Sequence, residues 1–516
     1  MISPPLEGSG EVFNEQKYKD LLEGLEVTEV FKSELSKNDD NENFRIDSDF
    51  FKKEFIIDEK NIKTNKWDYL GNLSKSIINF GAYSLCNQID FLEEGVPYLN
   101  VADIKEDVIN WENAKKISKD LSVGLLHKSL AKHEQVLLTI AGTIGNAAVA
   151  YKLPMHTNSN QAIANITTKE ELNPFYLSVY LNSKYGKSQT RKLTISSVQP
   201  NLLLTQVKRI KVPILPIDFQ QEIEKSVKVA HSKREQSQTL YCQAEELLLE
   251  TIGLEPGFLQ DYKDCQDKEN LVNLENLNKI LVQTKTQTKT QTNYNIKTFK
   301  ESFLTTGRLD AEYYQPKYEE MIKHIGKFET EIVKNIVKIK KSIEPGSDAY
   351  QNEGIPFIRV ANVSKFGITD TDIYLDKKKY GNLGLQPQKD TILLSKDGSV
   401  GIAYKIEQNL DVITSGALLH LTVTNKDFLP DYLTLVLNSE VVKMQAERDA
   451  GGSIIQHWKP SEIEQVIIPK LSMEIQQQIS ALIQESFALR KESKRLLVEA
   501  KAMVEREIEK KIEILC

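Results

Sequence analysis

A duplication runs through most of the 516-residue chain and sets what it can fold into. The segment Glu94–Ile104 (EGVPYLNVADI) recurs as Glu353–Val363 (EGIPFIRVANV), at an offset of 259 residues. Further on, Leu137–Gly145 recurs as Leu393–Gly401 at an offset of 256, which the later matches keep. Collinear matches with small changes of offset are typical of a duplicated domain whose loops differ in length. We therefore expect two copies of one unit.

Five further matches lie in the same order along the chain. They pair Phe31–Leu35 with Phe299–Phe303, Arg45–Phe51 with Arg308–Tyr314, Pro174–Ser183 with Pro430–Ser439, Val212–Ile214 with Ile468–Lys470, and Gln220–Ile223 with Gln476–Ile479. Pro174 and Pro430 stand where a helix should begin, because the first helical turn does not need the amide hydrogen that proline lacks.

Each copy is predicted to hold a globular part, residues 44–215 and 307–471, followed by a long polar helix, residues 216–253 and 472–516. The globular parts mix short β-branched runs, such as Val136–Ile140, with helical stretches. The predicted fold class is α+β (mixed α/β). Residues 1–43 form an N-terminal segment and residues 254–306 a linker, which contains the low-complexity run Gln283–Thr292.

The two polar helices carry apolar residues at spacings of four and three. In the first helix these are Ile223, Val227, Ala230, Tyr241, Ala244 and Leu248, and in the second Ile475, Ile479, Leu482, Leu489, Leu496, Ala500 and Met503. Such a stripe needs an apolar partner, and each helix is a natural partner for the other in a coiled coil. The alternative is that each helix packs only on its own globular part.

Bulk composition narrows the class of protein. The net charge of −7 and the pI near 5.8 argue against a protein that coats DNA by charge alone. The four cysteines are scattered without a CxxC pair, which indicates neither a zinc site nor a disulfide framework and fits a cytoplasmic protein. We expect no membrane span, and the N-terminus does not resemble a signal peptide.

Motifs that suggest catalysis have simpler structural explanations. Asn173–Tyr176 (NPFY) superficially resembles an adenine-methyltransferase motif, but the second copy has Leu429 in place of the asparagine. Gly142–Gly145 and Gly398–Gly401 lack the spacing of a phosphate-binding loop, so we expect turns between strands. The seven histidines are dispersed, and no metal or nucleophilic site is predicted.

Binding chemistry is better represented than catalysis. Before each long helix lies a polar stretch that mixes hydroxyl, amide and basic side chains, although a solvated loop would have a similar composition. Arg and Lys suit phosphates or guanine, while Asn and Gln suit adenine. The candidate DNA-binding residues are Lys184, Lys187, Thr190, Arg191, Lys192, Ser197, Gln199, Asn201, Thr143, Ser399, Lys396, Arg448, Ser453, Gln456, His457 and Lys459.

These features together resemble the specificity subunit of Type I restriction–modification systems. The resemblance is carried by the opening Arg45–Phe51, the passages Ser197–Leu202 and Val212–Pro216, and the Gln-Gln-x-Ile helix start in both copies. It spans nearly the whole chain. The second copy has Ile455–His457 where the first has Gln199–Asn201, so the roles of single residues do not transfer directly between copies.

The resemblance implies a non-catalytic subunit that takes part in phage defence. Each globular part would be a target recognition domain that reads one half of a split, asymmetric site in double-stranded DNA. The long helices would pair antiparallel, separate the half-sites and dock two methyltransferase subunits, which two restriction (motor) subunits would join. The docking residues would be Ile223, Val227, Leu248, Ile475, Ile479, Leu482 and Leu489. S-adenosylmethionine, ATP and Mg would belong to the partner subunits, with no cofactor in this chain.

Two other classes of function remain open from the sequence. A protein–protein scaffold of a related defence complex would also use paired helices, and it predicts no electropositive groove on the globular parts. A fused DNA-modification enzyme would need methyl-donor or nuclease motifs, which we do not find in the sequence.

Overall fold

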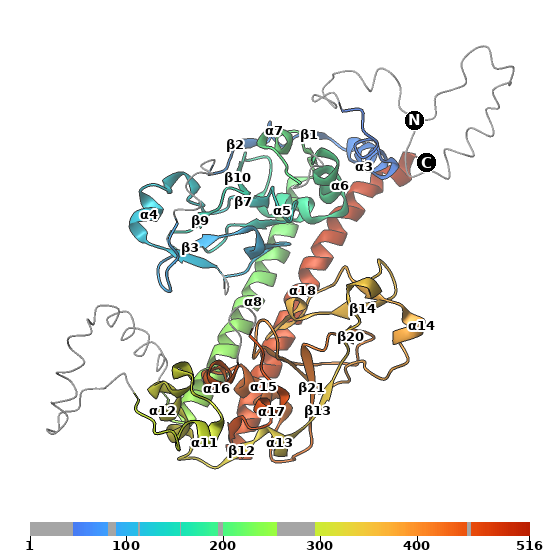
Figure 1. Cartoon of the computed structure of the whole chain (residues 1–516). Coiled ribbons are helices and arrows are strands. Elements are labelled where there is room, and N and C mark those ends of the chain that lie inside the picture. The colour runs from blue at the N-terminus through green and yellow to red at the C-terminus, as the bar shows by residue number, and fades with distance from the viewer. Residues whose placement is uncertain are drawn as a thin grey trace. The chain divides into compact units, whose positions relative to one another are not determined.

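The computed structural model describes residues 45–80, 89–111, 114–154, 156–194, 200–254, 295–450 and 456–515 (Figure 1). Outside these ranges lie three candidate DNA-binding residues, the predicted segment 1–43 and the run Gln283–Thr292. The three residues are Ser197, Gln199 and Ser453. The contacts divide the chain into two compact units. Unit 1 comprises the residues up to 234 and those from 491 onward, and unit 2 comprises residues 235–490.

Both unit boundaries fall inside the two long helices, α8 (Ile217–Thr251) and α18 (Met473–Leu515). Each unit therefore contains a globular part together with one portion of each long helix. None of the helices in the described ranges is both long and apolar enough to cross a membrane.

The globular part of unit 1 is built on a four-stranded antiparallel sheet. Its order is β2 (Ser74–Ile78), β10 (Ile163–Thr168), β7 (Val136–Thr139) and β8 (Ala147–Val149). A three-stranded sheet has the order β6 (Lys115–Ile117), β3 (Val96–Leu99), β9 (Asn158–Ser159). Two further strand pairs are β1 (Trp67–Tyr69) with β11 (Lys211–Pro213), and β4 (Ile104–Lys105) with β5 (Val108–Ile109). The helices are α3 (Lys53–Lys63), α4 (Lys119–Val123), α5 (Pro174–Asn182), α6 (Lys184–Leu193) and α7 (Leu204–Val207).

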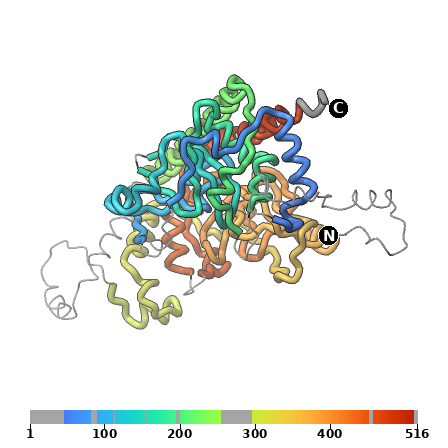
Figure 2. Tube along the Cα trace, turned by 90° about the horizontal axis from the view of Figure 1, so that it is seen from above, coloured from blue at the N-terminus to red at the C-terminus, as the bar shows by residue number. Residues whose placement is uncertain are grey.

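Unit 2 has the same sheet order. Its four-stranded sheet runs β13 (Val337–Lys341), β21 (Leu418–Val423), β18 (Ile392–Ser395), β19 (Ala403–Lys405). The smaller sheet runs β17 (Tyr374–Leu375), β14 (Ile355–Ile358), β20 (Ile413–Thr414). The strand pairs are β12 (Thr330–Ile332) with β22 (Ile467–Pro469), and β15 (Val363–Ser364) with β16 (Gly367–Ile368). The helices are α11 (Phe303–Thr306), α12 (Pro316–Ile325), α13 (Val333–Ile336), α14 (Lys377–Tyr380), α15 (Pro430–Asn438), α16 (Glu440–Asp449) and α17 (Pro460–Ile463). The mixed helix-and-strand class expected from the sequence is thus observed in both units, and the Cα trace in Figure 2 allows each to be followed.

Each four-stranded sheet is fastened to a buried helix by one asparagine. In unit 1 the amide of Asn182, at the end of α5, accepts from the backbone N–H of Ala147 at 2.9 Å and donates to its carbonyl at 2.8 Å. In unit 2 Asn438 makes the same two bonds to Ala403, at 3.0 and 2.8 Å. A buried amide paired in this way fixes the helix on the edge strand β8 or β19.

The predicted helix starts are confirmed, and Asn173 has a structural role. Asn173 caps α5, because its Oδ1 accepts from the backbone N–H groups of Phe175 at 2.9 Å and Tyr176 at 3.3 Å. The first glutamine of each Gln-Gln-x-Ile motif holds the loop before this helix. Gln220 accepts from the N–H of Asn173 at 2.8 Å, and Gln476 accepts from that of Leu429 at 2.9 Å.

The predicted stripe on α8 is confirmed, and the one on α18 needs correction. Ile223, Val227, Ala230, Tyr241, Ala244 and Leu248 are all buried. On α18 the buried apolar residues are Ile479, Ile483, Leu497, Ala500, Val504 and Ile508. The predicted positions Ile475, Leu482, Leu489, Leu496 and Met503 are only half-buried. Three of them, Leu482, Leu496 and Met503, directly precede a buried apolar residue, so spacing alone selected the flank of the stripe there.

The buried serines show which face of α18 is covered. In unit 2 the Ser486 hydroxyl donates to the carbonyl of Ser237 on α8 at 2.7 Å. In unit 1 the Ser493 hydroxyl donates to the carbonyl of Ala230 at 2.7 Å. Small side chains that satisfy their own hydroxyls allow the helix backbones to approach closely.

Candidate nucleic-acid interface

The Gly-x-x-Gly segments are turns between the inner strands of each sheet. Gly142 and Gly145 connect β7 to β8 with φ of +72° and +87°, and Gly398 and Gly401 connect β18 to β19 with φ of +75° and +86°. A Cβ on Gly145 would lie 2.7 Å from the Thr190 Oγ1 of α6, so this turn also needs glycine for close approach. The predicted turn between strands is confirmed in both units.

In each unit the loop that follows α6 or α16 is hydrogen-bonded to this turn. The N–H of Leu202 donates to the carbonyl of Ile140 at 2.8 Å, and Ala141 and Asn201 form an antiparallel bridge. We call this arrangement, residues 140–145 with 201–202, the turn–loop junction of unit 1. Its side chains Thr143 and Asn201 are exposed and half-buried, respectively.

The turn–loop junction of unit 2 comprises residues 396–401 with 456–459. The N–H of Trp458 donates to the carbonyl of Lys396 at 2.8 Å, as Leu202 does to Ile140, and Asp397 bridges His457. The Nδ1 of His457 lies 2.9 Å from the carboxylate of Asp397, which also pairs with the Lys396 ammonium. Burial opposes ionisation of Asp397, but these two partners hold its pKa below the usual range.

The junction of unit 2 exposes the residue types predicted for DNA contact. Ser399, Gln456, His457 and Lys459 are exposed. The Lys459 ammonium lies 3.3 Å from Glu462, an ion pair that solvent weakens because the lysine side chain is 73% exposed.

Helix α6 carries three exposed or half-buried basic residues, of which Lys187 reaches the junction of unit 1. The Lys187 ammonium donates to the Oδ1 of Asn146 at 2.6 Å and lies 3.4 Å from Glu106. Burial lowers the pKa of Lys187, and the Glu106 charge partly offsets that effect. Arg191 is exposed, and within the described residues its guanidinium has no hydrogen bond or ion pair. Lys184, at the start of α6, pairs instead with Glu509 on α18. The residues expected as a polar stretch therefore begin as a helix, with Lys187 and Arg191 one turn apart.

Two predicted contact residues of α6 are buried. Thr190 is 1% exposed and Lys192 is 8% exposed. The Lys192 ammonium lies 2.5 Å from Glu59 on α3, which also pairs with Lys211 at 3.0 Å. Burial would raise the pKa of Glu59, but the charges of Lys192 and Lys211 outweigh it and hold the value at about 2. Lys192 thus belongs to a buried ion cluster. Because Thr190 and Lys192 are both buried, we no longer propose that they contact DNA.

Arg448 also has a structural role. Its guanidinium pairs with Asp449 at 2.7 Å and lies over the ring of Tyr313, 5.2 Å from the ring centroid. The recurring Arg-x-Asp motif binds the end of the same helix. In unit 2 Arg308 donates to the carbonyl of Asp449 at the end of α16. Arg45 does the same for Lys192 and Thr194 around the end of α6. The recurrence of this motif therefore reflects helix capping.

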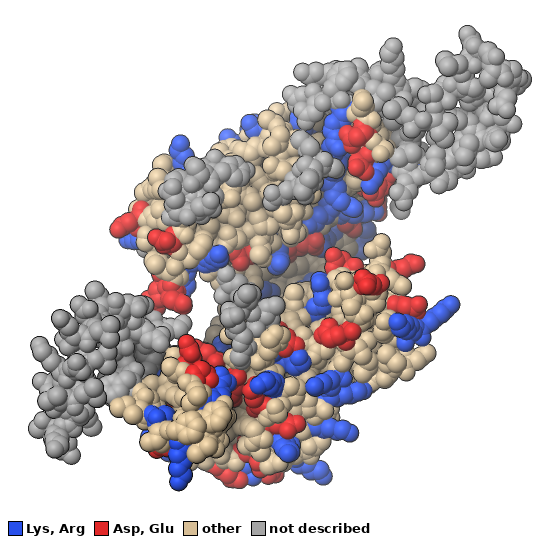
Figure 3. Space-filling view, viewed as in Figure 1, with Lys and Arg blue, Asp and Glu red and all other residues tan. Residues whose placement is uncertain are grey.

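The sequence did not identify Asn146 and Glu106, which hold Lys187 in place. Both lie in turns far from α6 in sequence, so no local pattern links them to Lys187. Another basic group, Lys377–Lys379, lies exposed in the short helix α14. On the face shown in Figure 3, however, basic side chains are interspersed with acidic ones over unit 2.

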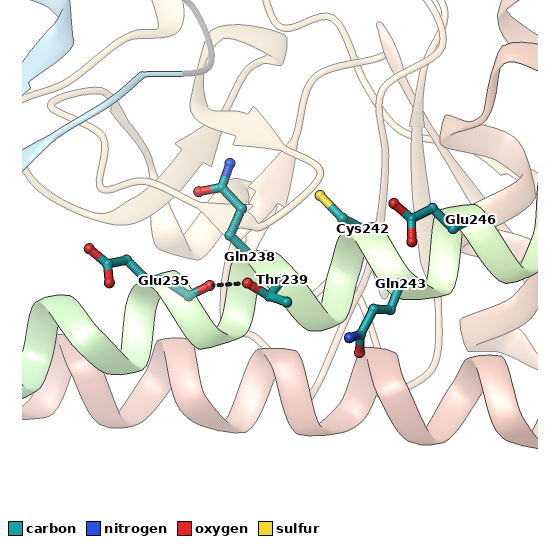
Figure 4. A pocket seen from close by; sticks show the side chains of 6 residues that line it. All are labelled: Glu235, Gln238, Thr239, Cys242, Gln243 and Glu246. Atoms are coloured by element: carbon teal, nitrogen blue, oxygen red, sulfur yellow. Dashed lines mark hydrogen bonds between the residues drawn. The ribbon is translucent and has the colours of Figure 1, made fainter. Parts of the chain in front are cut away.

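A hollow lies along α8. Its lining, Glu235, Gln238, Thr239, Cys242, Gln243 and Glu246, belongs to this one helix (Figure 4). The Thr239 hydroxyl donates to the carbonyl of Glu235 at 3.1 Å, an ordinary bond within a helix. Among the residues with described positions, no three His, Cys, Asp or Glu side chains are grouped to hold a metal ion.

Comparison with known proteins gives the class of this chain. The family described as the Type I restriction modification DNA specificity domain matches it twice, over residues 38–236 and 326–497. The chain belongs to this family of specificity subunits.

Individual relatives are more distant. Over 185 residues, 35% of this chain, it is 24% identical to the Type I restriction enzyme EcoBI specificity subunit of Escherichia coli, and the match spans 38% of that relative's length. The Type-I restriction-modification S subunit from M. genitalium is 14% identical, with a TM-score of 0.37 over 85% of this chain and 95% of its own. The HsdS subunit from Thermoanaerobacter tengcongensis is 12% identical, with a TM-score of 0.25 over 86% and 97%. At these TM-scores the comparison does not establish that the domains and helices of the chains are arranged alike.

Proposed function

We propose that this chain reads a bipartite, asymmetric site in double-stranded DNA, with residues 44–215 and 307–471 each recognising one half. The observation that carries the proposal is the turn–loop junction. Equivalent backbone hydrogen bonds build it in both units, around exposed amide, hydroxyl, imidazole and cationic side chains. The family match supports DNA as the ligand.

In unit 1, Arg191 and Lys187 would contact phosphates or a guanine edge, and Asn201 an adenine. In unit 2, Gln456, His457 and Lys459 would read bases or hold phosphates. The exposed hydroxyls of Thr143 and Ser399, at the tips of the glycine turns, would fix position on the backbone. Lys184 and Lys396 would act more weakly, because each is already paired with a carboxylate.

The segments 216–253 and 472–516 would pair as an antiparallel coiled coil that separates the half-sites. In support, each unit packs one portion of α8 on one portion of α18 through apolar residues and a buried serine. The predicted docking residues Ile223, Val227, Leu248 and Ile479 are buried, so they would hold the helices together. The outer faces of the helices would instead dock two methyltransferase subunits, joined by two restriction subunits. The methylation, cleavage and cofactors would then belong to those partners, and this chain would act without catalysis in the cytoplasm.

Two single substitutions test whether the site is bipartite. Once the target is known, Arg191→Ala should weaken binding roughly tenfold and relax discrimination only in the half-site of unit 1. His457→Ala should relax only the other half-site. The matched control, Arg495→Ala, removes an exposed cation from α18 and should leave binding unchanged. Equal effects of all three variants, or no effect of any, would reject the proposal.

A further inference from the structure

In each unit, one short hairpin turn of the globular part touches the long helices. In unit 1 it is the turn between β4 and β5, where Glu106 pairs with Lys501 of α18 at 2.5 Å. In unit 2 it is the turn between β15 and β16, where Lys365 pairs with Glu245 of α8 at 3.3 Å. We call these two turns, residues 106–107 and 365–366, the docking turns.

The docking turns use equivalent positions with opposite charges. Lys365 follows Glu106 at the offset of 259 that relates this part of the two copies. Lys501 follows Glu245 at the offset of 256 that relates the segments further on. An acidic turn therefore meets a basic helix in unit 1, and a basic turn meets an acidic helix in unit 2. Burial opposes ionisation of Glu106, yet its hydrogen bond from Lys501 and the charge of Lys187 keep its pKa below normal.

The next residue of each turn also differs in chemistry. Asp107 is 1% exposed, and its carboxylate accepts from the Ser178 hydroxyl at 2.6 Å. The backbone carbonyl of Asp107 accepts a hydrogen bond from His231 Nε2 of α8 at 2.8 Å. The docking turn of unit 1 is thus held by polar bonds on both residues.

In unit 2 the position of Asp107 is taken by Phe366. Its ring meets Tyr241 edge-on with a centroid separation of 4.9 Å, and the Arg490 guanidinium lies over it at 3.6 Å. Phe487, the counterpart of His231 at the offset of 256, lies 6.5 Å from it. The second docking turn is therefore aromatic where the first is polar.

We propose that Glu106–Lys501 and Lys365–Glu245 are specificity pairs that make each globular part dock only on its own portion of the long helices. If each globular part packed instead on the helix portions of the other unit, Glu106 would face Glu245 and Lys365 would face Lys501. This exchange would also separate the Asp107 carbonyl from His231 of α8 and place the polar Asp107 beside the rings of Tyr241 and Phe487. Like charges repel and a lost hydrogen bond at a buried turn is costly, so both effects disfavour the exchange. This role is independent of which DNA sequence is read.

A charge exchange in the full-length chain tests the pairs. The double variant Glu106→Lys/Lys365→Glu keeps the net charge but places like charges in both docking turns. Hydrogen–deuterium exchange of residues 104–109 and 363–368 should then speed up roughly threefold to tenfold, the range for replacing a partly exposed attraction by repulsion. Adding Glu245→Lys and Lys501→Glu restores both pairs with reversed sign and should return the protection to within about twofold.

A matched control exchanges charges elsewhere on α18. Lys494 and Glu499 are exposed and lie outside the docking turns, so Lys494→Glu/Glu499→Lys should leave exchange in the turns unchanged. A fourfold variant no better protected than the double variant would overturn the proposal, and so would a double variant that matches the parent chain. Because neither readout involves DNA, failure here is distinct from failure of DNA recognition.

Discussion

His457 lies opposite Asp397 across an antiparallel bridge, with its Nδ1 2.9 Å from the carboxylate Oδ1. The same carboxylate pairs with Lys396, the residue whose carbonyl accepts from Trp458. One acidic side chain therefore orients two of the groups proposed to meet DNA in unit 2.

Asp397→Asn should loosen base discrimination without loss of affinity. The amide keeps the backbone bridge but no longer holds the imidazole and ammonium by charge, while removal of a negative charge favours phosphate approach. We expect overall affinity within about threefold of the parent and discrimination in the second half-site lowered roughly tenfold. Competition between matched and mismatched duplexes measures both quantities, and unchanged discrimination would contradict the assigned role.

Glu59→Gln should destabilise unit 1. The substitution leaves Lys192 and Lys211, which are 8% and 4% exposed, without their carboxylate. Removal of one partner from a buried ion pair costs about 3–5 kcal/mol. Denaturant unfolding of the full chain should show this loss in the transition of unit 1. The control Glu499→Gln changes an exposed pair on α18 and should be close to neutral. Equal stability of the two variants would contradict the role of Glu59.

Asp107→Asn should remove a pH dependence of stability. Burial raises the pKa of Asp107 from the usual 3.8 to about 6. The folded state then binds the proton more tightly than the unfolded state. The resulting stability is fully present below pH 3.8 and is lost as the pH rises through about 6. Between these values the parent should lose roughly 1.4 kcal/mol per pH unit relative to Asp107→Asn. Parallel stability curves for the two proteins would contradict the shift.

Ile479→Asp should disturb the helix packing far more than Leu482→Asp. Ile479 is fully buried in the core of unit 2, whereas Leu482 lies half-buried at its edge. A charge at the buried position has no partner and should lower the unfolding free energy by roughly 3 kcal/mol or more. The same charge at Leu482 can reach solvent and should cost about 1 kcal/mol. Thermal unfolding of both variants distinguishes them, and equal losses would show that the buried face is wrongly assigned.

Local chemistry made parts of the fold predictable. Pro174 and Pro430 mark helix starts by their missing amide hydrogen, and the glycine pairs mark turns by their positive φ. The spacing of four and three located the buried positions of α8 correctly, although Leu247 and Leu249 flank Leu248. On α18 adjacent apolar residues, such as Leu482 and Ile483, obscured which one faces inward.

The candidate site was predictable only in part, because burial depends on distant partners. Lys192 looked like a surface cation, and its partner Glu59 lies 133 residues earlier in the chain. Arg448 was similar, since the fold alone brings the ring of Tyr313 under its guanidinium, which also pairs with the adjacent Asp449. By contrast Arg191, His457 and Lys459 are exposed, as contact residues must be.

The most direct test of DNA reading is the pattern of methylated sites across the genome of cells that contain the partner methyltransferase, with and without this chain. We predict a split sequence motif, methylated only when the chain is present, whose one half changes with Arg191→Ala and whose other half changes with His457→Ala. Methylation at the same motif without the chain, or no motif although chain and methyltransferase co-purify, would contradict its role as the sequence reader.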